Sequence, residues 1–368
     1  MKFTCEKYLL DAAVTTAGRA APVKPTIDSL SGLLVQAAVS VCITGYDLKK
    51  GIYTRFEADV SAQGSVVVNA RLLGEIVRKL PDGIVTFVSD GNNMVNISCG
   101  NADYSIMGSD PEDYPDLPDM DYSHSITMMQ DVLSRMISET SFAISDNESR
   151  PVYTGALFEV ENDDLTIVAV DGYRLALRRE ALSKSDTEEC RFIVPGSALS
   201  DLEKICCSVG DPVSITVGSK HISFTVGDTV LITRRLEGEF LNYKKTLPSV
   251  FPVTLTANRS ELIRCAERVS LIIDDRTKNP LRCCFDDNVL NISCATPLGR
   301  AEDSCALRGS GGGMLIGFNN TYLLQALKAA PCEELTVNLT NGNSPCVLLP
   351  VDESGSFLYM ILPVRMRG

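Results

Sequence analysis

The sequence has no tryptophan and only two histidines in 368 residues, His124 and His221. It also lacks the features of a membrane protein or an exported one. No apolar run approaches the ~18 residues that a membrane-spanning helix needs. The start, MKFTCEKYLL, mixes charges into its apolar residues and does not resemble a secretory signal. We therefore expect a protein of the cytoplasm.

Motifs of catalysis and ligand binding are missing as well. The chain has no G-x-S-x-G, Walker A or H-E-x-x-H pattern, and neither histidine has a partner motif. The glycine run at 309–313 precedes the strand-like MLIGF, so it predicts a hairpin turn instead of a phosphate site. The acidic stretch 109–121 lacks EF-hand spacing and predicts a solvated linker. We expect no catalytic, metal-binding or cofactor-binding residue.

Cysteine, in contrast, is abundant. The chain has thirteen cysteines but no C-x-x-C pair, and most of them lie in apolar runs such as the ISC segments that end at Cys99 and Cys294. Buried, reduced thiols are favoured over disulfides or metal ligands by this pattern.

The net charge of −13 argues against a nucleic-acid partner when it is taken alone. The predicted helices, however, carry nearly equal numbers of basic and acidic residues, so the acidic excess falls on the remainder of the chain. Helices that face a polyanion would give this segregation, although ordinary solvated helices would also give it. Any DNA contact is expected to involve phosphates and to weaken with salt.

Three cues recur in the same order along the chain. Small turns between strand-like runs contain Gly45, Gly172 and Gly299, which are equally spaced. A large apolar residue and a helix-capping type then open a helix at 68–69, 194–195 and 318–319, and a tyrosine before Leu-Pro closes each repeat near 114, 243 and 359. A period this long indicates tandem domains instead of a short-repeat solenoid.

Each repeat is predicted to fold as an α+β domain with two helices on one face of an antiparallel sheet. In the middle repeat, apolar residues from Met129 to Ile137 recur with helical spacing, and a second helix follows Pro195. Strand-like segments surround both helices. We predict domains at 1–122, 123–250 and 251–368. Open sheet edges at the two chain ends would invite pairing with another subunit, and a closed ring is one solution.

The whole chain resembles the beta sliding clamp of bacterial replicative DNA polymerase III. The resemblance is carried by MKFTCEKYLL, VDGYRLAL, IGFNNTYLLQAL and YMILPVRMR, together with the three-repeat length. It implies a homodimer of three-domain subunits that forms a six-domain ring. Such a ring encircles duplex DNA and acts as a processivity factor in DNA replication. It tethers the replicative polymerase, the clamp loader and repair proteins, and catalyses nothing itself.

The resemblance also implies a pocket between domains 2 and 3 that binds short peptides of these partners. Its matching residues are Arg150, Tyr153, Val170, Gly172, Tyr173, Arg174, Leu175, Leu241, Lys245, Thr246, Asn319, Tyr322, Asn343, Pro345, Met360, Ile361, Leu362, Pro363, Val364, Arg365 and Met366. Tyr173, Leu241 and Lys245 depart from the family's commoner histidine, proline and arginine, and Arg367 and Gly368 extend the tail. The alternative is that Val170, Leu175 and the tail are strand core, and for the tail alone the two interpretations are equally favoured.

Two further surfaces follow from the same resemblance. The expected DNA-facing residues are Lys24, Arg71, Arg78, Lys79, Arg150 and Lys204. The expected dimer interface brings Tyr104 and Ile106 of one subunit against Leu271 and Ile272 of the other.

Two other classes of function stay open at this point. One is a monomeric peptide-binding scaffold with the same fold that does not encircle DNA. The other is a hydrolase with unrecognised acidic residues, for which the sequence offers no coherent site.

Overall fold

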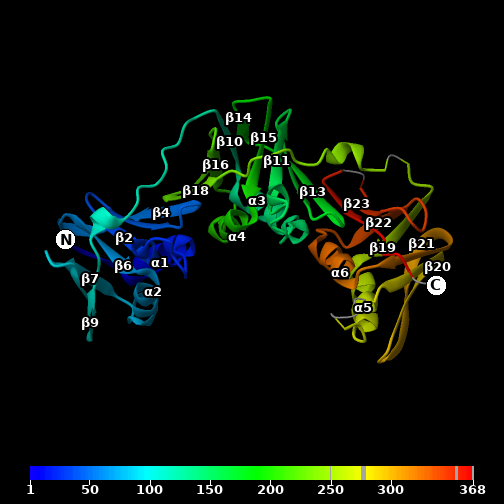
Figure 1. Cartoon of the computed structure of the whole chain (residues 1–368), viewed down its shortest axis with the longest axis horizontal. Helices are drawn as coiled ribbons and strands as arrows, with labels where there is room; N and C mark the ends of the chain where they lie inside the picture. Colours follow the sequence, from blue (N-terminus) through cyan, green and yellow to red (C-terminus); the bar gives the residue numbers. More distant parts are fainter. Residues whose placement is uncertain (249, 275–278, 353–354, 367–368) are drawn as a thin grey trace. The chain divides into compact units, whose positions relative to one another are not determined.

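The computed structural model describes residues 1–368 except 249, 275–278, 353–354 and 367–368 (Figure 1). The chain divides into two compact units. Unit 1 contains Met1–Asp131, Ser183–Thr187 and Asp201–Arg235. Unit 2 contains Val132–Leu182, Glu188–Ser200 and the described residues from Leu236 onward.

Unit 1 holds two antiparallel sheets. The five-stranded sheet has the order β5 (Asp59–Ala62), β1 (Lys2–Glu6), β7 (Ile84–Ser89), β8 (Met94–Cys99) and β9 (Ala102–Met107). The nine-stranded sheet has the order β14 (Lys184–Ser185), β10 (His124–Met129), β16 (Pro212–Val217), β17 (His221–Val226), β18 (Thr229–Arg234), β4 (Lys50–Phe56), β3 (Val41–Tyr46), β2 (Gly32–Ala37) and β6 (Gly64–Asn69).

Helices α1 (Lys7–Ala17) and α2 (Ala70–Lys79) pack against each other in unit 1, as the blue part of Figure 1 shows. The Asn69 side chain accepts a hydrogen bond from Leu72 N and so caps α2, as the second repeat cue predicts. The apolar faces of both helices join a core in which Phe3 and Phe87 stack with ring centroids 5.0 Å apart.

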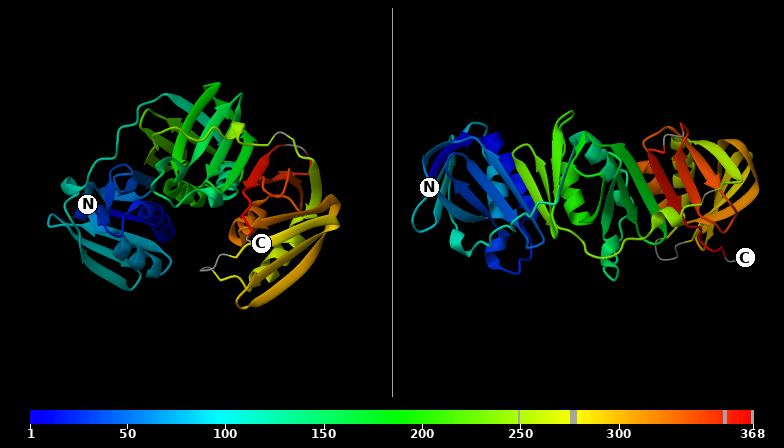
Figure 2. Two further views of the ribbon diagram at one scale, coloured as in Figure 1. Left: turned by 45° about the vertical axis from the view of Figure 1, so that its right-hand side comes forward. Right: turned by 90° about the horizontal axis from the view of Figure 1, so that it is seen from above.

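Unit 2 is built around one ten-stranded sheet. Its order is β15 (Glu189–Pro195), β11 (Gly155–Glu161), β12 (Asp164–Val170), β13 (Arg174–Ala181), β24 (Phe357–Ile361), β23 (Cys346–Pro350), β22 (Glu334–Leu339), β19 (Val253–Asn258), β21 (Gly299–Phe318) and β20 (Leu281–Thr296). Figure 2 shows the long β20–β21 hairpin in yellow and orange.

Helices α5 (Arg259–Ser270) and α6 (Asn320–Ala329) pack together in unit 2. Asn258 accepts a hydrogen bond from Glu261 N and so caps α5. Asn319 accepts one from Tyr322 N, so α6 begins at the predicted cap. The remaining two helices, α3 (Gln130–Ser138) and α4 (Gly196–Ile205), come from the middle repeat and have residues in both units.

The repeat prediction is confirmed by the pairing of the strands. In each third, the first strand pairs with the strand that follows the second helix: β1 with β7, β10 with β16 and β19 with β22. That strand begins a three-stranded meander, β7-β8-β9, β16-β17-β18 or β22-β23-β24. Two α-helices accompany the sheets of each third in the part of the chain that the structure describes. The α+β prediction is therefore also confirmed.

Thirds of the chain are joined by two antiparallel pairings, which we call seams. Seam 1 pairs β18 of the middle third with β4 of the first, from Thr229 opposite Thr54 to Thr233 opposite Lys50. Seam 2 pairs β24 of the last third with β13 of the middle third. The middle third thus gives strands to both large sheets.

Two local predictions were wrong. Gly45 lies inside β3, and a Cβ there would meet Ala17 O at 2.1 Å, so glycine is needed for a close approach and not for a turn. The glycine run 309–313 lies within β21, where the β20–β21 register shifts between Phe285 and Val289. It interrupts a strand instead of turning a hairpin, because other β21 residues continue the pairing beyond it.

Among the described residues, no helix is both long and apolar enough to cross a membrane.

Candidate functional site

The residues predicted for the peptide pocket gather around seam 2. Leu175 lies opposite Met360, and Arg174 lies opposite Ile361. Beyond β24 the chain continues as a tail, in which Leu362 N donates to Tyr173 O at 2.8 Å and Val364 N donates to Gly317 O at 2.8 Å. These two bonds fix the tail across residues of the middle and last thirds.

An apolar cluster forms the floor of the site. Val170, Leu175 and Met360 are buried in it beside Leu157, Tyr243 and Val347. The linker between the last two thirds covers this cluster with Leu236, Phe240, Leu241 and Leu247, which are partly buried against it. Val170, Leu175 and Met360 are therefore core residues beneath the site, and the residues that cover them control access to them.

Tyr243 anchors the covering linker. Its ring is buried, and its hydroxyl donates to the carboxylate of Glu159, which is almost fully buried on β11. Lys244 Nζ lies 3.1 Å from Glu159 Oε2 and 2.6 Å from Glu161 Oε1. Burial raises the pKa of the Tyr243 hydroxyl, so it stays protonated as a donor. Lys245 and Thr246 follow this anchor and are exposed.

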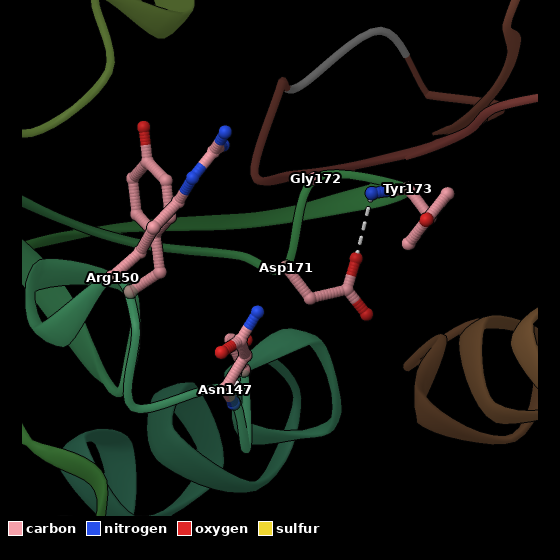
Figure 3. A pocket seen from close by; sticks show the side chains of 7 residues that line it. Asn147, Arg150, Asp171, Gly172 and Tyr173 are labelled. Carbon is pink, nitrogen blue, oxygen red and sulfur yellow. Dashed lines mark hydrogen bonds between the residues drawn. The ribbon is translucent and has the colours of Figure 1, made fainter.

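A hollow of about 300 Å³ opens beside the seam (Figure 3). Its lining is Ser145, Asn147, Arg150, Tyr153, Asp171, Gly172 and Tyr173. Figure 3 shows Arg150 and Tyr173 on opposite sides, with the Asp171–Gly172 corner between them. No ion pair of the exposed Arg150 is found among the described residues. The hollow therefore offers aromatic walls and a cation, Arg150, that has no ion-pair partner in the part of the chain that the structure describes.

The corner that carries Tyr173 is held by Asp171. Its Oδ1 accepts from Tyr173 N at 2.8 Å and Arg174 N at 3.0 Å, an arrangement typical of an Asx turn. Gly172 adopts φ +94°, in the region that glycine enters without strain. The tight turn projects Tyr173 outward, and its side chain is 62% exposed.

Arg174 ties the corner to the last third. Its Nε lies 2.9 Å from Asp171 Oδ2, and its Nη1 bonds the side chain of Gln325 on α6. The guanidinium carbon also lies 4.4 Å from the ring centroid of Tyr322. Tyr322 in turn stacks on Tyr173 with centroids 6.1 Å apart. Tyr173, Tyr322 and Arg174 thus form a layered stack at the edge of the site.

The tail lines a second hollow of about 850 Å³. Its walls are Leu315, Gly342, Asn343, Leu362, Pro363, Val364, Arg365 and Met366. Asn343 belongs to the turn between β22 and β23, where its N–H donates to Asn341 Oδ1. Pro345 follows in the same turn and is half-buried. The two hollows and the stack together form a site with apolar residues at its base and polar residues at its rim, as suits an extended peptide.

Comparisons with known proteins decide the family. Models of the DNA polymerase III beta subunit match the N-terminal domain at residues 1–118, the central domain at 127–242 and the C-terminal domain at 244–365. The chain is 30% identical to the beta sliding clamp of Synechocystis and 29% identical to that of Staphylococcus epidermidis, over at least 99% of each chain.

This chain belongs to the beta sliding clamp family. Among solved structures, a putative DNA polymerase III beta subunit from Eubacterium rectale matches with 30% identity and a TM-score of 0.94. The Bacillus subtilis DNA polymerase sliding clamp matches with 27% identity and the same score, and both matches cover each chain completely. The chain is accordingly a sliding clamp, a non-catalytic processivity factor of DNA replication.

Some residues that line the two hollows were not predicted from the sequence. Asp171 could have been found, because an Asp-Gly pair before a strand is typical of a turn that the aspartate side chain holds. Ser145 and Asn147 lie in an irregular segment, and Leu315 and Gly342 come from distant parts of the chain. No sequence pattern indicates that these four line the hollows.

The predicted DNA-facing residues of the clamp are all exposed. Arg78 and Lys79 end α2, Lys204 lies near the end of α4, and Lys24 and Arg150 lie in loops. Arg71 forms an exposed ion pair with Glu75 at 2.9 Å, which leaves its charge partly balanced. No ion pair of the other five is found within the described residues.

The predicted interface residues lie on two separate elements. Tyr104 and Ile106 are half-buried on β9, which is the edge strand of the five-stranded sheet. Leu271 follows α5 and is 84% exposed, whereas the neighbouring Ile272 is half-buried.

Proposed function

We propose that two copies of this clamp close head to tail into a six-domain ring around duplex DNA. The ring would hold polymerase, clamp loader and repair proteins through short peptides that bind at seam 2. The proposed domains are residues 1–122, 123–250 and 251–368, and the proposed compartment is the cytoplasm.

The way the two seams are built carries this proposal. In each seam, the last strand of one domain's second meander pairs with the third strand of the preceding domain's first meander, which is β2-β3-β4 or β11-β12-β13. The two pairs are β18 with β4 and β24 with β13. By the same rule, β9 of the first domain would pair with residues 299–306 of β21 in a last domain. In the described chain, β9 pairs only with β8, and residues 299–306 pair only with β20.

Both unfilled edges carry apolar residues. Tyr104 and Ile106 lie on β9, and Leu271 and Ile272 follow α5, which packs on β21. Unpaired edges with apolar neighbours favour association, and equivalent edges at opposite ends of one chain favour a head-to-tail joint. A second copy would supply each edge with its missing strand.

DNA binding would use the exposed cations at 24, 71, 78, 79, 150 and 204. Their contacts would be to phosphates, without selection among base sequences. Such contacts are weak and lose affinity as salt rises, so retention of the clamp would depend on closure of the ring and not on the strength of the contacts.

The first experiment measures the mass of the intact clamp in solution by light scattering. We expect twice the chain mass at micromolar concentration. Ile106→Lys should give the single-chain mass, because a charge would be buried in the joint. Val39→Lys is the matched control, since Val39 is 94% exposed in the β2–β3 turn. A wild-type protein that stays at the single-chain mass would contradict the ring and favour a monomeric scaffold.

The second experiment tests encirclement. Clamp loaded by its clamp loader should remain on nicked circular DNA in high salt and should leave when the DNA is linearised. Equal loss from both substrates would rule out topological retention.

The third experiment tests the peptide site. Deletion of residues 362–368 removes the described tail and its bonds to Tyr173 and Gly317. We expect loss of binding to a peptide that contains glutamine followed by apolar and aromatic residues, with the dimer intact. Unchanged peptide affinity would show that the site lies elsewhere.

A further inference from the structure

The cysteines of this clamp have no place in its function as a processivity factor. Most of them are buried and unreactive: burial raises the pKa of Cys5, Cys206 and Cys346 to about 12 each. A protonated thiol is a poor nucleophile. Two cysteines of the last third, Cys265 and Cys305, have a different environment.

Cys265 lies on α5 and Cys305 lies on β21, and these two elements pack against each other. Cys265 lies on the buried face of α5 with Leu262, Ala266 and Val269. Arg268, one turn later on α5, forms an ion pair with Asp303, which lies two residues before Cys305 on β21. Since residues two apart on a strand share a face, the ion pair and the two thiols are successive contacts of the same helix and strand.

The two thiols differ in their chemistry. Interaction with the Cys265 thiol lowers the pKa of Cys305, and interaction with Cys305 raises the pKa of Cys265. Cys305 is half-buried, whereas Cys265 is fully buried. Cys305 is therefore both the more acidic thiol and the one that a small oxidant can reach, and Cys265 is the neighbouring thiol that can react with it.

We propose that Cys305 and Cys265 form a reversible disulfide when the clamp meets a peroxide. The Cys305 thiolate attacks one peroxide oxygen, the O–O bond breaks, and the products are a sulfenic acid and hydroxide. The Cys265 thiol then attacks the Cys305 sulfur, the S–O bond breaks, and water leaves with the thiol proton. A dithiol reductant reverses the reaction by thiol–disulfide exchange.

The disulfide would have a defined structural consequence. The loop that it closes, residues 265–305, contains Leu271, Ile272 and the first part of the free edge of β21. Oxidation would therefore tie together the two segments that we assign to the ring joint. This consequence rests on the proposed ring, whereas the disulfide itself does not.

The experiment treats the full-length clamp with hydrogen peroxide, blocks free thiols with an alkylating reagent and maps the peptides by mass spectrometry. We expect a linked pair of peptides that contain Cys265 and Cys305, lighter by two hydrogens than the separate peptides. The link should disappear with dithiothreitol. Exposed Cys207 provides the control, because Cys207→Ser should retain the link.

Dimedone, which traps sulfenic acids, tests which of the two cysteines is oxidised first. In Cys265→Ser and Cys265→Ala the adduct should accumulate on Cys305, and in the wild type it should stay several-fold lower because Cys265 consumes the sulfenic acid. Absence of the linked peptides from the wild type, or equal trapping in wild type and variants, would overturn the proposal.

Discussion

The two seams of this clamp have the same pattern of backbone pairing, but different side chains surround them. Both are five-residue antiparallel ladders between equivalent strands. Both are also covered by a linker that a buried tyrosine anchors: Tyr114 donates to Thr44 O near seam 1, and Tyr243 donates to Glu159 near seam 2. The main-chain pairing and the anchored linker therefore do not distinguish the two seams.

Side chains account for the difference. At seam 1, Leu117 of the linker packs directly over Gly51, where a Cβ would lie 2.3 Å from Leu117 Cδ2. The hydroxyls of Thr54 and Thr229 lie 2.8 Å apart across the ladder. Seam 2 instead has an apolar floor, two hollows and the exposed Tyr173. The filled joint at seam 1 holds two domains together, and the more open joint at seam 2 is where we propose that a peptide binds.

The largest expected effect concerns seam 1. Lys50 forms an ion pair with Asp201, and both side chains are nearly buried. Lys50→Ala leaves that carboxylate without its partner, so we expect the free energy of unfolding to fall by about 3–5 kcal/mol. Denaturant unfolding measures this change. Exposed Lys49→Ala is the matched control and should stay near wild type.

The same variant tests whether the seams are independent. Peptide affinity of Lys50→Ala, measured where the variant remains folded, should equal that of the wild type. A weaker affinity would show that seam 1 supports the proposed peptide site and that the two seams do not differ in this respect.

The next effect concerns the stack at seam 2. Arg174→Lys keeps the charge but loses the planar group that lies over Tyr322 and bonds Asp171 and Gln325. We expect a loss of about 1–2 kcal/mol of stability, from the cation–π contact and one hydrogen bond. Chemical denaturation measures it. An unfolding midpoint equal to that of the wild type would mean that the stack does not stabilise the seam.

A smaller effect is expected for Tyr173. Tyr173→Ala removes an exposed ring, so stability should change by no more than about 0.5 kcal/mol. Peptide affinity should fall by roughly 1 kcal/mol, about fivefold, because a peptide would lose an aromatic contact. Titration calorimetry gives both the affinity and the stoichiometry. Tyr8→Ala, in which an equally exposed tyrosine of α1 is removed, should bind peptide normally.

The smallest effect is a change in pH dependence. Burial raises the pKa of Glu139, against the opposing influence of Arg178, whose Nε lies 2.7 Å from Glu139 Oε2. A raised folded-state pKa means that the contribution of Glu139 is full below its ordinary value of 4.5 and is lost as pH rises through the folded value. Glu139→Gln should therefore gain stability relative to wild type as pH rises above about 4.5. Unfolding curves from pH 4 to 8 test this sign.

Much of the fold was predictable because its signals are local. The helix caps Asn69, Asn258 and Asn319 are short polar residues placed before apolar periodic segments, and all three accept the expected backbone hydrogen bond. The repeated tyrosine before Leu-Pro marks a linker anchor at Tyr114 and Tyr243. At Tyr359 it marks a buried strand residue of β24 instead. The tyrosine before Leu-Pro therefore occurs in two different structural settings.

The site was predictable only in part, since its openness is a property of packing. Val170 and Leu175 are strand residues, and nothing in their sequence tells whether the linker covers them or leaves them open. Gly45 and the run 309–313 show the same limit. Each glycine is required by a distant segment, Ala17 for the first and Phe285 for Gly311, and such contacts have no local pattern.

The division of the middle third between two sheets has a consequence for how the chain folds. Strands β10, β14 and β16–β18 belong to the sheet that includes the first third, and β11–β13 and β15 belong to the sheet that includes the last. Cut out alone, the middle third would expose the edges of β18 and β13, which are normally paired. We expect it to aggregate, whereas in the full chain its folding cooperativity is shared with both neighbours.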